Sequence, residues 1–177
     1  MNRINRAKKI RRELISIFVP VILVLAIIYI FFTYCVTRSK IISRSMEPTL
    51  KVGDVVYINK LAYIRSDIQR GDVVWFICDE EGNEGDIFVK RVIGLPGDAI
   101  SFEDGYVFIN GVMLDESAYL DSDIETDSSK SFNVPDGCYF LMGDNRENSN
   151  DCRRFANPYI PRERIIGKFL GKEAFWK

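Results

Sequence analysis

The stretch Ser43-Arg44-Ser45-Met46-Glu47-Pro48-Thr49-Leu50 is predicted to form a turn, and it follows shortly after a long apolar run. The ring of Pro48 locks its own φ angle and biases Glu47 toward an extended conformation. The backbone around Ser45 is therefore expected to leave helical geometry and form a rigid turn. A serine on such a turn is a candidate nucleophile, although the same residues also fit an ordinary link between a strand and a turn.

A basic segment and an apolar run precede this turn. Residues 1–13 contain six Lys or Arg residues and one acidic residue, whereas residues 14–36 contain no charged residue. As a helix these 23 residues span about 35 Å, enough to cross a bilayer, and apolar side chains cover every face. A cleavable signal peptide would have a shorter apolar region of about 7 to 15 residues. We therefore predict a permanent transmembrane helix.

The excess of basic residues before the span predicts its orientation. By the positive-inside rule, residues 1–13 form a cytoplasmic tail and residues 37–177 an extracytoplasmic domain. Ser45 follows Val36 by nine positions, and a chain of this length extends no further than about 30 Å. The candidate nucleophile is thus expected to work near the outer membrane surface, on a substrate embedded in the bilayer or emerging from it.

The chain contains no histidine, which excludes Ser-His-Asp and Cys-His nucleophile systems and histidine-containing zinc sites. A hydrolase with this sequence must take its general base from Lys, Asp, Glu or a terminal amine. Residues 37–177 hold 18 basic and 24 acidic residues, so nucleic acid is not expected as a partner. The four cysteines include no C-x-x-C pair, and we expect neither a metal nor a cofactor. A bridge between Cys78 and Cys138 is left open.

Three Gly-Asp pairs indicate a β protein, because each precedes a short run of β-branched or aromatic residues. The runs are residues 55–58, 73–77 and 87–89, and we expect them to form consecutive strands of a meander. Residues 107–109 and 112–114 flank Asn110-Gly111, which predicts a hairpin with a type I′ turn. The expected fold is mainly β, with antiparallel sheets after the transmembrane helix.

Residues 115–131 change to Asp, Ser, Glu and Thr with few apolar side chains. We predict a polar surface excursion whose acidity keeps it solvated. Apolar runs return near residues 138–142 and 165–170. The tail Ala174-Phe175-Trp176 is predicted to close the core, with contact to the membrane interface as the alternative.

Without histidine, a serine nucleophile needs a base such as a neutral lysine. The reference pKa of lysine, near 10.4, must then be lowered to about 7 to 8 by burial or by a neighbouring charge. Lys90 lies between the apolar residues 87–89 and 92–93, where a charged side chain is out of place. We predict Lys90 as the general base, with a strand lysine directed toward solvent as the alternative.

Besides the Ser45 turn and the strand with Lys90, a third candidate stretch is residues 143–153. It is dense in hydrogen-bonding side chains and directly follows an apolar run. As part of a site, Ser149 is expected to orient the amine of Lys90. Asp151 and Arg153 are expected to brace the loop through an ion pair. The alternative is an ordinary polar loop with Asx turns.

Four stretches together resemble the successive conserved boxes of bacterial type I signal peptidases. They are Ser-Met-Glu-Pro-Thr-Leu at 45–50, Gly-Asp-Val-Val-Tyr-Ile-Asn-Lys at 53–60, Lys-Arg-Val-Ile-Gly-Leu-Pro-Gly-Asp at 90–98 and Gly-Asp-Asn-Arg-Glu-Asn-Ser-Asn-Asp-Cys-Arg at 143–153. Their order and spacing match as well. The resemblance implies a membrane-anchored Ser-Lys endopeptidase that removes signal peptides from exported preproteins. It also implies a signal-peptidase-like catalytic domain outside the bacterial cell membrane.

The resemblance further implies a role for each matching residue. Ser45 matches the nucleophile and Lys90 the general base, while the backbone N–H of Ser45 and the hydroxyl of Ser43 match the oxyanion donors. Many relatives carry glycine in place of Ser43, and Ser149 matches the residue that positions the lysine. The other supporting positions are Met46, Arg91, Asp144, Asp151 and Arg153. The positions that match shallow apolar substrate pockets are Ile41, Ile42, Phe88 and Val89.

Two positions depart from the family pattern. Cys152 stands where relatives commonly have serine, and we expect it to change redox sensitivity more than catalysis. Arg44 replaces a small residue next to the nucleophile, and we expect it to change substrate preference.

Two alternatives remain for the function. One is a specialised Ser-Lys processing protease for one pilin or conjugation substrate, and the other is an anchored β domain that binds without catalysis. A self-cleaving repressor fits less well because the chain has an apolar anchor and no DNA-binding region. The expected partners are signal peptides, the lipid bilayer and the translocation machinery.

Overall fold

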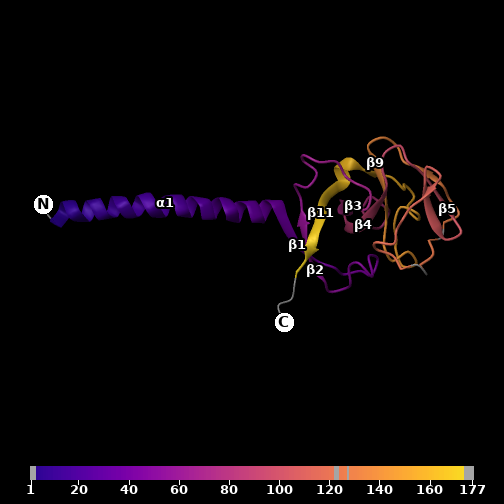
Figure 1. Cartoon of the computed structure of the whole chain (residues 1–177), viewed down its shortest axis with the longest axis horizontal. Helices are drawn as coiled ribbons and strands as arrows, with labels where there is room; N and C mark the ends of the chain where they lie inside the picture. The colour runs from indigo at the N-terminus through magenta and orange to yellow at the C-terminus, as the bar shows by residue number, and fades with distance from the viewer. Residues whose placement is uncertain (1–2, 122–123, 127, 174–177) are drawn as a thin grey trace. The chain divides into compact units, whose positions relative to one another are not determined.

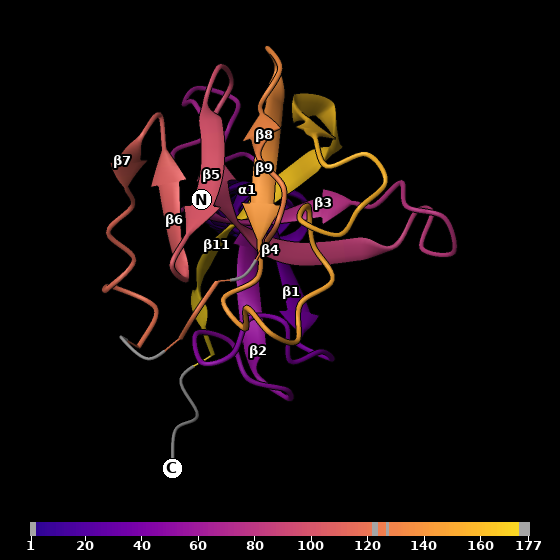
Figure 2. The ribbon, with the colours of Figure 1, turned by 90° about the vertical axis from the view of Figure 1, so that its right-hand side faces the viewer.

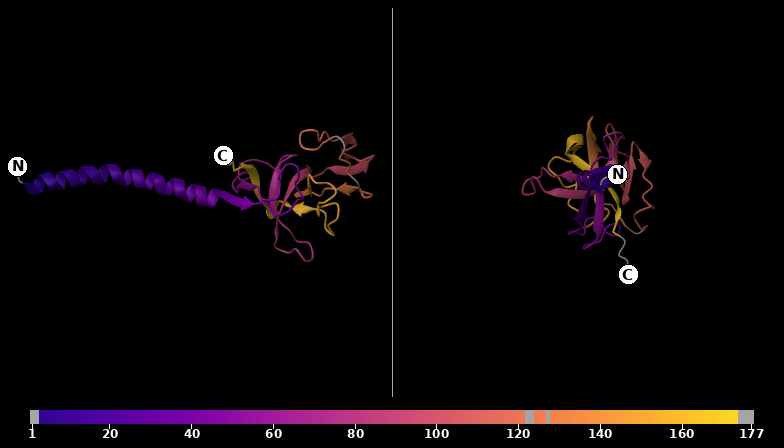
Figure 3. Two further views of the ribbon diagram at one scale, coloured as in Figure 1. Left: turned by 90° about the horizontal axis from the view of Figure 1, so that it is seen from below. Right: turned by 90° about the vertical axis from the view of Figure 1, so that its left-hand side faces the viewer.

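The apolar segment near the N-terminus forms one helix, α1 (Arg3–Cys35), in the computed structural model, which describes residues 3–121, 124–126 and 128–173. Pro20 lies inside α1, and Figure 3 shows the N-terminal helix as one unbroken ribbon. Its portion Arg11–Cys35 has 25 residues and is long and apolar enough to cross a membrane. At 1.5 Å per residue this portion is about 37 Å long. The tail residues 174–176, predicted to close the core, lie outside the described residues.

The chain divides into two compact units, Met1–Thr37 and Arg38–Lys177. The second unit is mainly β, as the Gly-Asp rhythm of the sequence predicts, and Figure 1 labels its main strands. The elements after α1 are β1 (Val36–Lys40), β2 (Val55–Asn59), β3 (Val73–Ile77), β4 (Ile87–Gly94), β5 (Ala99–Glu103), β6 (Tyr106–Ile109), β7 (Val112–Met113), β8 (Phe132–Asn133), β9 (Cys138–Met142), β10 (Ile160–Pro161), the 3-10 helix η1 (Arg162–Arg164) and β11 (Ile165–Lys172).

These strands form two sheets. The larger has the order β1-β2-β11-β3-β4-β9-β10, and the smaller has the order β7-β6-β5-β8. Figure 2 shows β5, β6 and β7 of the smaller sheet side by side. The prediction of a simple meander is wrong at β2 and β3, because β11 lies between them and is antiparallel to both. Local turn signals could not predict this pairing, since β11 comes from the other end of the chain.

The predicted hairpin is confirmed by β6 and β7. Val112 pairs with Ile109 across the turn, and Asn110 and Gly111 have φ angles of 53° and 79°. Two consecutive positive φ angles are the requirement of a type I′ turn. Asparagine and glycine tolerate this conformation better than other residues, so the short sequence signal sufficed here.

Apolar side chains pack on both faces of the larger sheet. Along β3, Val74 and Phe76 belong to a large cluster that also contains Ile100 and Phe132 of the smaller sheet. Val73 and Trp75 belong to a second cluster that contains Met46, Leu50 and Val56. This division follows from the two-residue period of a strand. Most side chains of β3 and those of residues 90–94 in its neighbour β4 are therefore enclosed on both sides, which determines the environment of Lys90.

All four cysteines are free, so the structure has no bridge between Cys78 and Cys138. Most described residues of the predicted polar excursion at 115–131 are exposed or half-buried, but two of them contact the domain closely. Thr126 is only 2% exposed, and Glu116 forms an ion pair with the buried side chain of Arg146. The segment is attached to the domain by its polar groups, and composition alone could not distinguish this from solvation.

Candidate active site

The turn that carries Ser45 is fixed at both ends. Ile41 exchanges backbone hydrogen bonds with the turn at residues 53–54, and the Leu50 N–H donates to the carbonyl of Met46 over 2.7 Å. Met46 and Leu50 are fully buried in the smaller apolar cluster. The peptide bond between residues 47 and 48 is cis. Burial on either side of Ser45 thus holds the serine in one place.

Lys90 reaches Ser45 from β4. Its Nζ lies 2.8 Å from Ser45 Oγ, and its side chain is 3% exposed. Lys90 lies on the face of β4 that also carries Phe88 and Val92, directly opposite the buried Val74 of β3. The Phe88 ring centroid is 5.4 Å from the amine. An apolar strand environment therefore surrounds the amine, as the hydrophobic flanks in the sequence predict.

This environment changes the acidity of the amine. Burial lowers the pKa of Lys90 to about 8, and the negative charge of Asp151 acts in the opposite direction. The shift has the sign that a base working near neutral pH requires, because the neutral form becomes accessible.

Ser43 lies on the other side of the Ser45 hydroxyl. The two Oγ atoms are 3.3 Å apart, and either hydroxyl can be the donor. Ser43 is exposed, whereas Ser45 is buried. Among the described residues, none accepts a hydrogen bond from the backbone N–H of Ser45. A hydroxyl and an uncommitted N–H are thus both available beside the candidate nucleophile.

The loop at residues 143–153 packs directly on the backbone of this turn. Asn145 donates from its N–H to the carbonyl of Ser45 over 3.1 Å and from its side-chain amide to the carbonyl of Arg44 over 3.2 Å. A Cβ atom on Gly143 would collide with the carbonyl of Ser45 and with Ser149 Oγ. Glycine is therefore required for the close approach of the loop to the turn.

Arg153 holds Asp151 inside the loop. Its Nε and Nη2 donate to the two carboxylate oxygens, each over 2.9 Å, and the Gly143 N–H donates to the same carboxylate over 2.9 Å. Burial by itself raises the pKa of Asp151, but these partners overcome burial, so the pKa lies below its ordinary value. The carboxylate is therefore ionised and paired.

Ser149 is completely buried in the same loop. Its Oγ makes no hydrogen bond of good geometry within the part of the chain that the structure describes, although the hydroxyl is near enough to help lower the pKa of Asp151. The orientation of the Lys90 amine by Ser149, expected from the sequence, stays a prediction.

A second buried ion pair links three parts of the sequence. Arg91 donates to both oxygens of Asp144, over 2.8 Å from Nε and 2.6 Å from Nη2, and to the carbonyl of Gly71 over 2.8 Å. Thr49 Oγ1 also donates to Asp144, over 2.5 Å. The turn, β4 and the polar loop are thereby tied together. Sequence reasoning missed Thr49, because a threonine after proline gives no local signal of a distant partner.

The four predicted substrate positions have different environments. Ile41 is buried in the smaller cluster, whereas Ile42 is 86% exposed. Phe88 and Val89 are half-buried on opposite faces of β4, and Phe88 packs against Phe76 and Phe155. Ile42 is thus the position among the four with a side chain open to solvent.

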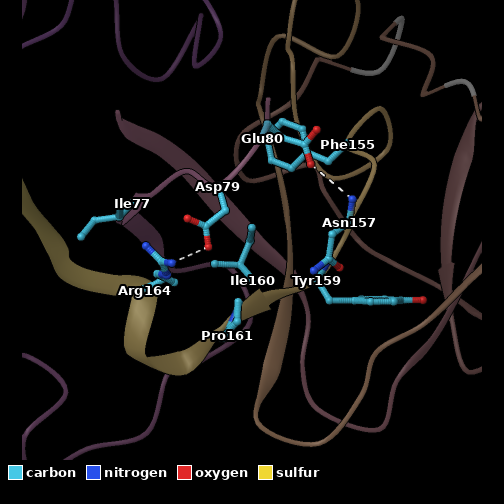
Figure 4. Close-up of a pocket in the computed structure, with 9 residues that line it drawn as sticks. All are labelled: Ile77, Asp79, Glu80, Phe155, Asn157, Tyr159, Ile160, Pro161 and Arg164. Carbon is cyan, nitrogen blue, oxygen red and sulfur yellow. Dashed lines mark hydrogen bonds and ion pairs between the residues drawn. The ribbon is translucent and has the colours of Figure 1, made fainter. Parts of the chain in front are cut away.

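The structure also has a small pocket away from Ser45 and Lys90 (Figure 4). Its polar side chains are already paired: Asp79 with Arg164 over 2.7 Å, and Glu80 with the N–H of Asn157 over 3.2 Å. No group of three or more Cys, Asp or Glu side chains that could hold a metal ion occurs among residues 3–121, 124–126 and 128–173.

Known proteins resemble this chain over most of its length. The sequence matches the family described as signal peptidase, peptidase S26, over residues 11–172. A probable signal peptidase I-2 of Synechocystis is 37% identical over 147 residues, which cover 81% of this chain and 65% of that protein. Signal peptidase IB of Staphylococcus aureus is 32% identical over 183 aligned positions, which cover 94% of this chain and 91% of that protein.

Among solved structures, a signal peptidase I from Enterococcus faecalis V583 is 28% identical, with a TM-score of 0.47 and coverage of 59% of this chain and 98% of that chain. The family match spans nearly the whole chain, and the staphylococcal relative aligns over 94% of it. By these two sequence comparisons, the chain belongs to the signal peptidase family, peptidase S26.

Proposed function

We propose that this protein is a membrane-anchored serine endopeptidase that cleaves signal peptides from exported preproteins, with Ser45 as nucleophile and Lys90 as general base. Membership of the signal peptidase family supports the reaction and the substrate class. The single observation that carries the residue assignment is the 2.8 Å contact between Lys90 Nζ and Ser45 Oγ inside an apolar environment.

The lowered pKa supports the role of Lys90. With a pKa of about 8, about a quarter of the amines are neutral at pH 7.5, compared with about 0.1% for an ordinary lysine. The neutral amine accepts the proton of the Ser45 hydroxyl while Ser45 Oγ attacks the carbonyl carbon of the scissile bond. The protonated amine then gives this proton to the departing amine of the mature protein. In the second half of the reaction, Lys90 activates a water that hydrolyses the acyl-enzyme.

The oxyanion of the tetrahedral intermediate needs donors near Ser45. The hydroxyl of Ser43 and the backbone N–H of Ser45 are the groups available in the described structure. Removal of one such donor in a serine protease raises the barrier by about 3 kcal/mol. This assignment requires the Ser43 hydroxyl to turn from Ser45 Oγ toward the substrate oxygen during the reaction.

The ion pair of Asp151 and Arg153 supports the proton transfer. Asp151 is the charge that acts most strongly on Lys90, and it favours the protonated amine. Arg153 binds both oxygens of this carboxylate and offsets its charge. The guanidinium therefore limits how far Asp151 raises the pKa of the base. A separate ion pair, between Arg91 of β4 and Asp144 of the loop, fixes the loop relative to β4.

The membrane anchor in this proposal is α1. The six basic residues at its start favour the cytoplasm, which leaves the β domain outside the cell membrane after a single pass. Signal peptides are themselves apolar and reach the enzyme through the bilayer. Contact with the lipid and with the translocation machinery follows from this arrangement.

The proposal is tested with the full chain in detergent micelles and a secretory preprotein. Ser45→Ala and Lys90→Ala should abolish cleavage, and Lys90→Arg should be inactive as well because a guanidinium remains protonated. Thermal unfolding of each variant shows whether the fold is retained. Cleavage of the preprotein by folded Lys90→Arg at the wild-type rate would refute the dyad.

A further inference from the structure

An acidic segment outside the four conserved boxes is attached to the site. We name it the acidic strap and define it as residues 115–121 and 124–126. The strap begins after β7 with a turn in which the Leu120 N–H donates to the carbonyl of Glu116 over 3.0 Å. It returns to the domain where the Thr126 N–H donates to the carbonyl of Gly105 over 2.7 Å.

Glu116 and Thr126 of the strap enclose the side chain of Arg146. The guanidinium donates to both oxygens of Glu116, over 3.0 Å from Nη1 and 2.5 Å from Nη2, and Nη1 also donates to Thr126 Oγ1. The Arg146 side chain is 1% exposed and that of Glu116 is 12% exposed. A buried arginine depends strongly on its carboxylate partner, because no water replaces that partner.

Arg146 belongs to the polar loop next to the catalytic pair. Its Nε donates to the carbonyl of Gly143 over 3.1 Å, and its own carbonyl accepts from Arg153 Nη2 over 2.7 Å. Gly143 packs on the Ser45 backbone, and Arg153 binds Asp151, the charge that acts most strongly on Lys90. The position of Arg146 therefore determines how the loop lies against both Ser45 and Lys90.

The strap makes a second contact through Tyr119. The guanidinium carbon of Arg91 lies 3.9 Å from the centre of the Tyr119 ring, and the Tyr119 hydroxyl donates to Glu116 over 2.7 Å. Arg91 follows Lys90 in β4 and binds Asp144. Glu116 is thus connected to two of the three arginines that fix the polar loop, to Arg146 directly and to Arg91 through Tyr119.

We propose that Glu116 is a positioning residue for signal-peptide cleavage: it holds Arg146 and, through Tyr119, Arg91, and so fixes the loop that lies beside Ser45 and Lys90. Glu116 does not touch the reacting atoms and acts through these neighbours. The inference rests on the proposed function, since it assumes that Lys90 is the base.

The test compares Glu116→Gln with Asp121→Asn in the full chain, using cleavage of a secretory preprotein in detergent. Both changes remove one acidic charge from the strap, but Asp121 is exposed and its carboxylate makes no ion pair within the described residues. Values of kcat and KM are measured separately from pH 6 to pH 10. Thermal unfolding reports the folded fraction of each variant.

Glu116→Gln is expected to lower kcat about tenfold with KM nearly unchanged. Glutamine keeps the shape of the side chain but not the charge, so Arg146 shifts toward water and the loop opens over Lys90. Water then restores part of the hydration of the amine, which raises its pKa, whereas a greater distance from Asp151, Cys152 and Asp144 lowers it. Burial is the largest influence on the pKa of Lys90, so hydration prevails and the acid limb of the pH profile moves to higher pH. Asp121→Asn should match the wild type in both readouts.

Tyr119→Phe provides a second variant that keeps the ring over Arg91 and removes only the bond to Glu116. It should lower kcat less than Glu116→Gln and move the acid limb in the same direction, and it decides the question if Glu116→Gln does not fold. An unchanged acid limb in the folded variants overturns the positioning role, even if kcat falls. Ser45→Ala and Lys90→Ala are assayed in parallel: their activity would overturn the proposed function itself, whereas their inactivity together with an unaffected Glu116→Gln would overturn the inference about Glu116 alone.

Discussion

Replacement of Lys90 by methionine should abolish cleavage and at the same time stabilise the folded β domain. The amine is 3% exposed, and burial lowers its pKa from 10.5 to about 8. A difference of 2.5 pKa units corresponds to about 3 kcal/mol of unfavourable free energy for the protonated amine in the folded state. Methionine has a similar length and no charge to desolvate, so Lys90→Met should recover about this amount at neutral pH.

The gain should depend on pH in a defined direction. Between pH 8 and pH 10.5 the unfolded chain keeps the lysine proton while the folded protein has lost it, so the wild-type free energy of unfolding rises with pH in this window. Below pH 8 the penalty on the wild type is fully present, and near pH 10.5 it is gone. The advantage of Lys90→Met is therefore expected to be largest at pH 7 and to vanish near pH 10.5.

Urea unfolding of the full chain in detergent, followed at pH 7 and pH 10 by tryptophan fluorescence, measures this difference. Lys60→Met is the matched control, because Lys60 is exposed and its replacement should change the free energy of unfolding by less than about 0.5 kcal/mol. A Lys90→Met protein with wild-type stability at pH 7, or with a gain that does not change with pH, would refute the claim that burial lowers the pKa of Lys90.

Further predictions concern the proposed catalytic pair and its neighbours. Cleavage by the wild type should fall about tenfold per pH unit well below pH 8, because Lys90 must be neutral, and a flat pH profile down to pH 6 would contradict this. Ser43→Ala should lower kcat about 100-fold with little change in KM, and unchanged turnover would remove its hydroxyl from the oxyanion site. Gly143→Ala should impair both folding and cleavage, because the added Cβ would collide with the Ser45 carbonyl. Thermal unfolding and the preprotein assay measure the two effects, and wild-type values in both would refute the prediction. Arg91→Ala should lower the free energy of unfolding by about 3 to 5 kcal/mol in urea titrations, because the buried Asp144 loses its ion-pair partner, and Arg91→Lys should restore part of the loss.

Some elements of the fold could be predicted because their signals are local. Asn110-Gly111 determines the hairpin of β6 and β7 through the positive φ angles that these two residues tolerate. The run of residues 73–77 appears as β3 with the predicted bounds. The insertion of β11 between β2 and β3 could not be predicted, because a strand pairing between distant segments leaves no trace in the turns that flank either strand.

The same contrast between local signals and long-range contacts applies to the candidate site. The missing histidine, the position of Ser45 close to Pro48 and the place of Lys90 within an apolar strand predict the two reacting groups, since each signal depends on residue type and immediate neighbours. Thr49 with Asp144, and Glu116 with Arg146, have no such signature, because each pair joins segments far apart in the chain.

The amino-acid sequence alone thus determined the class of chemistry, since residue types limit which groups can act as nucleophile and base. Only the tertiary structure decided that the Lys90 side chain is buried and that its Nζ lies 2.8 Å from Ser45 Oγ. It likewise decided that the acidic strap is tied to the domain through the ion pair of Glu116 with the buried Arg146. The physical reason is that desolvation and ion pairing depend on what surrounds a side chain in space, and those surroundings come from every part of the chain.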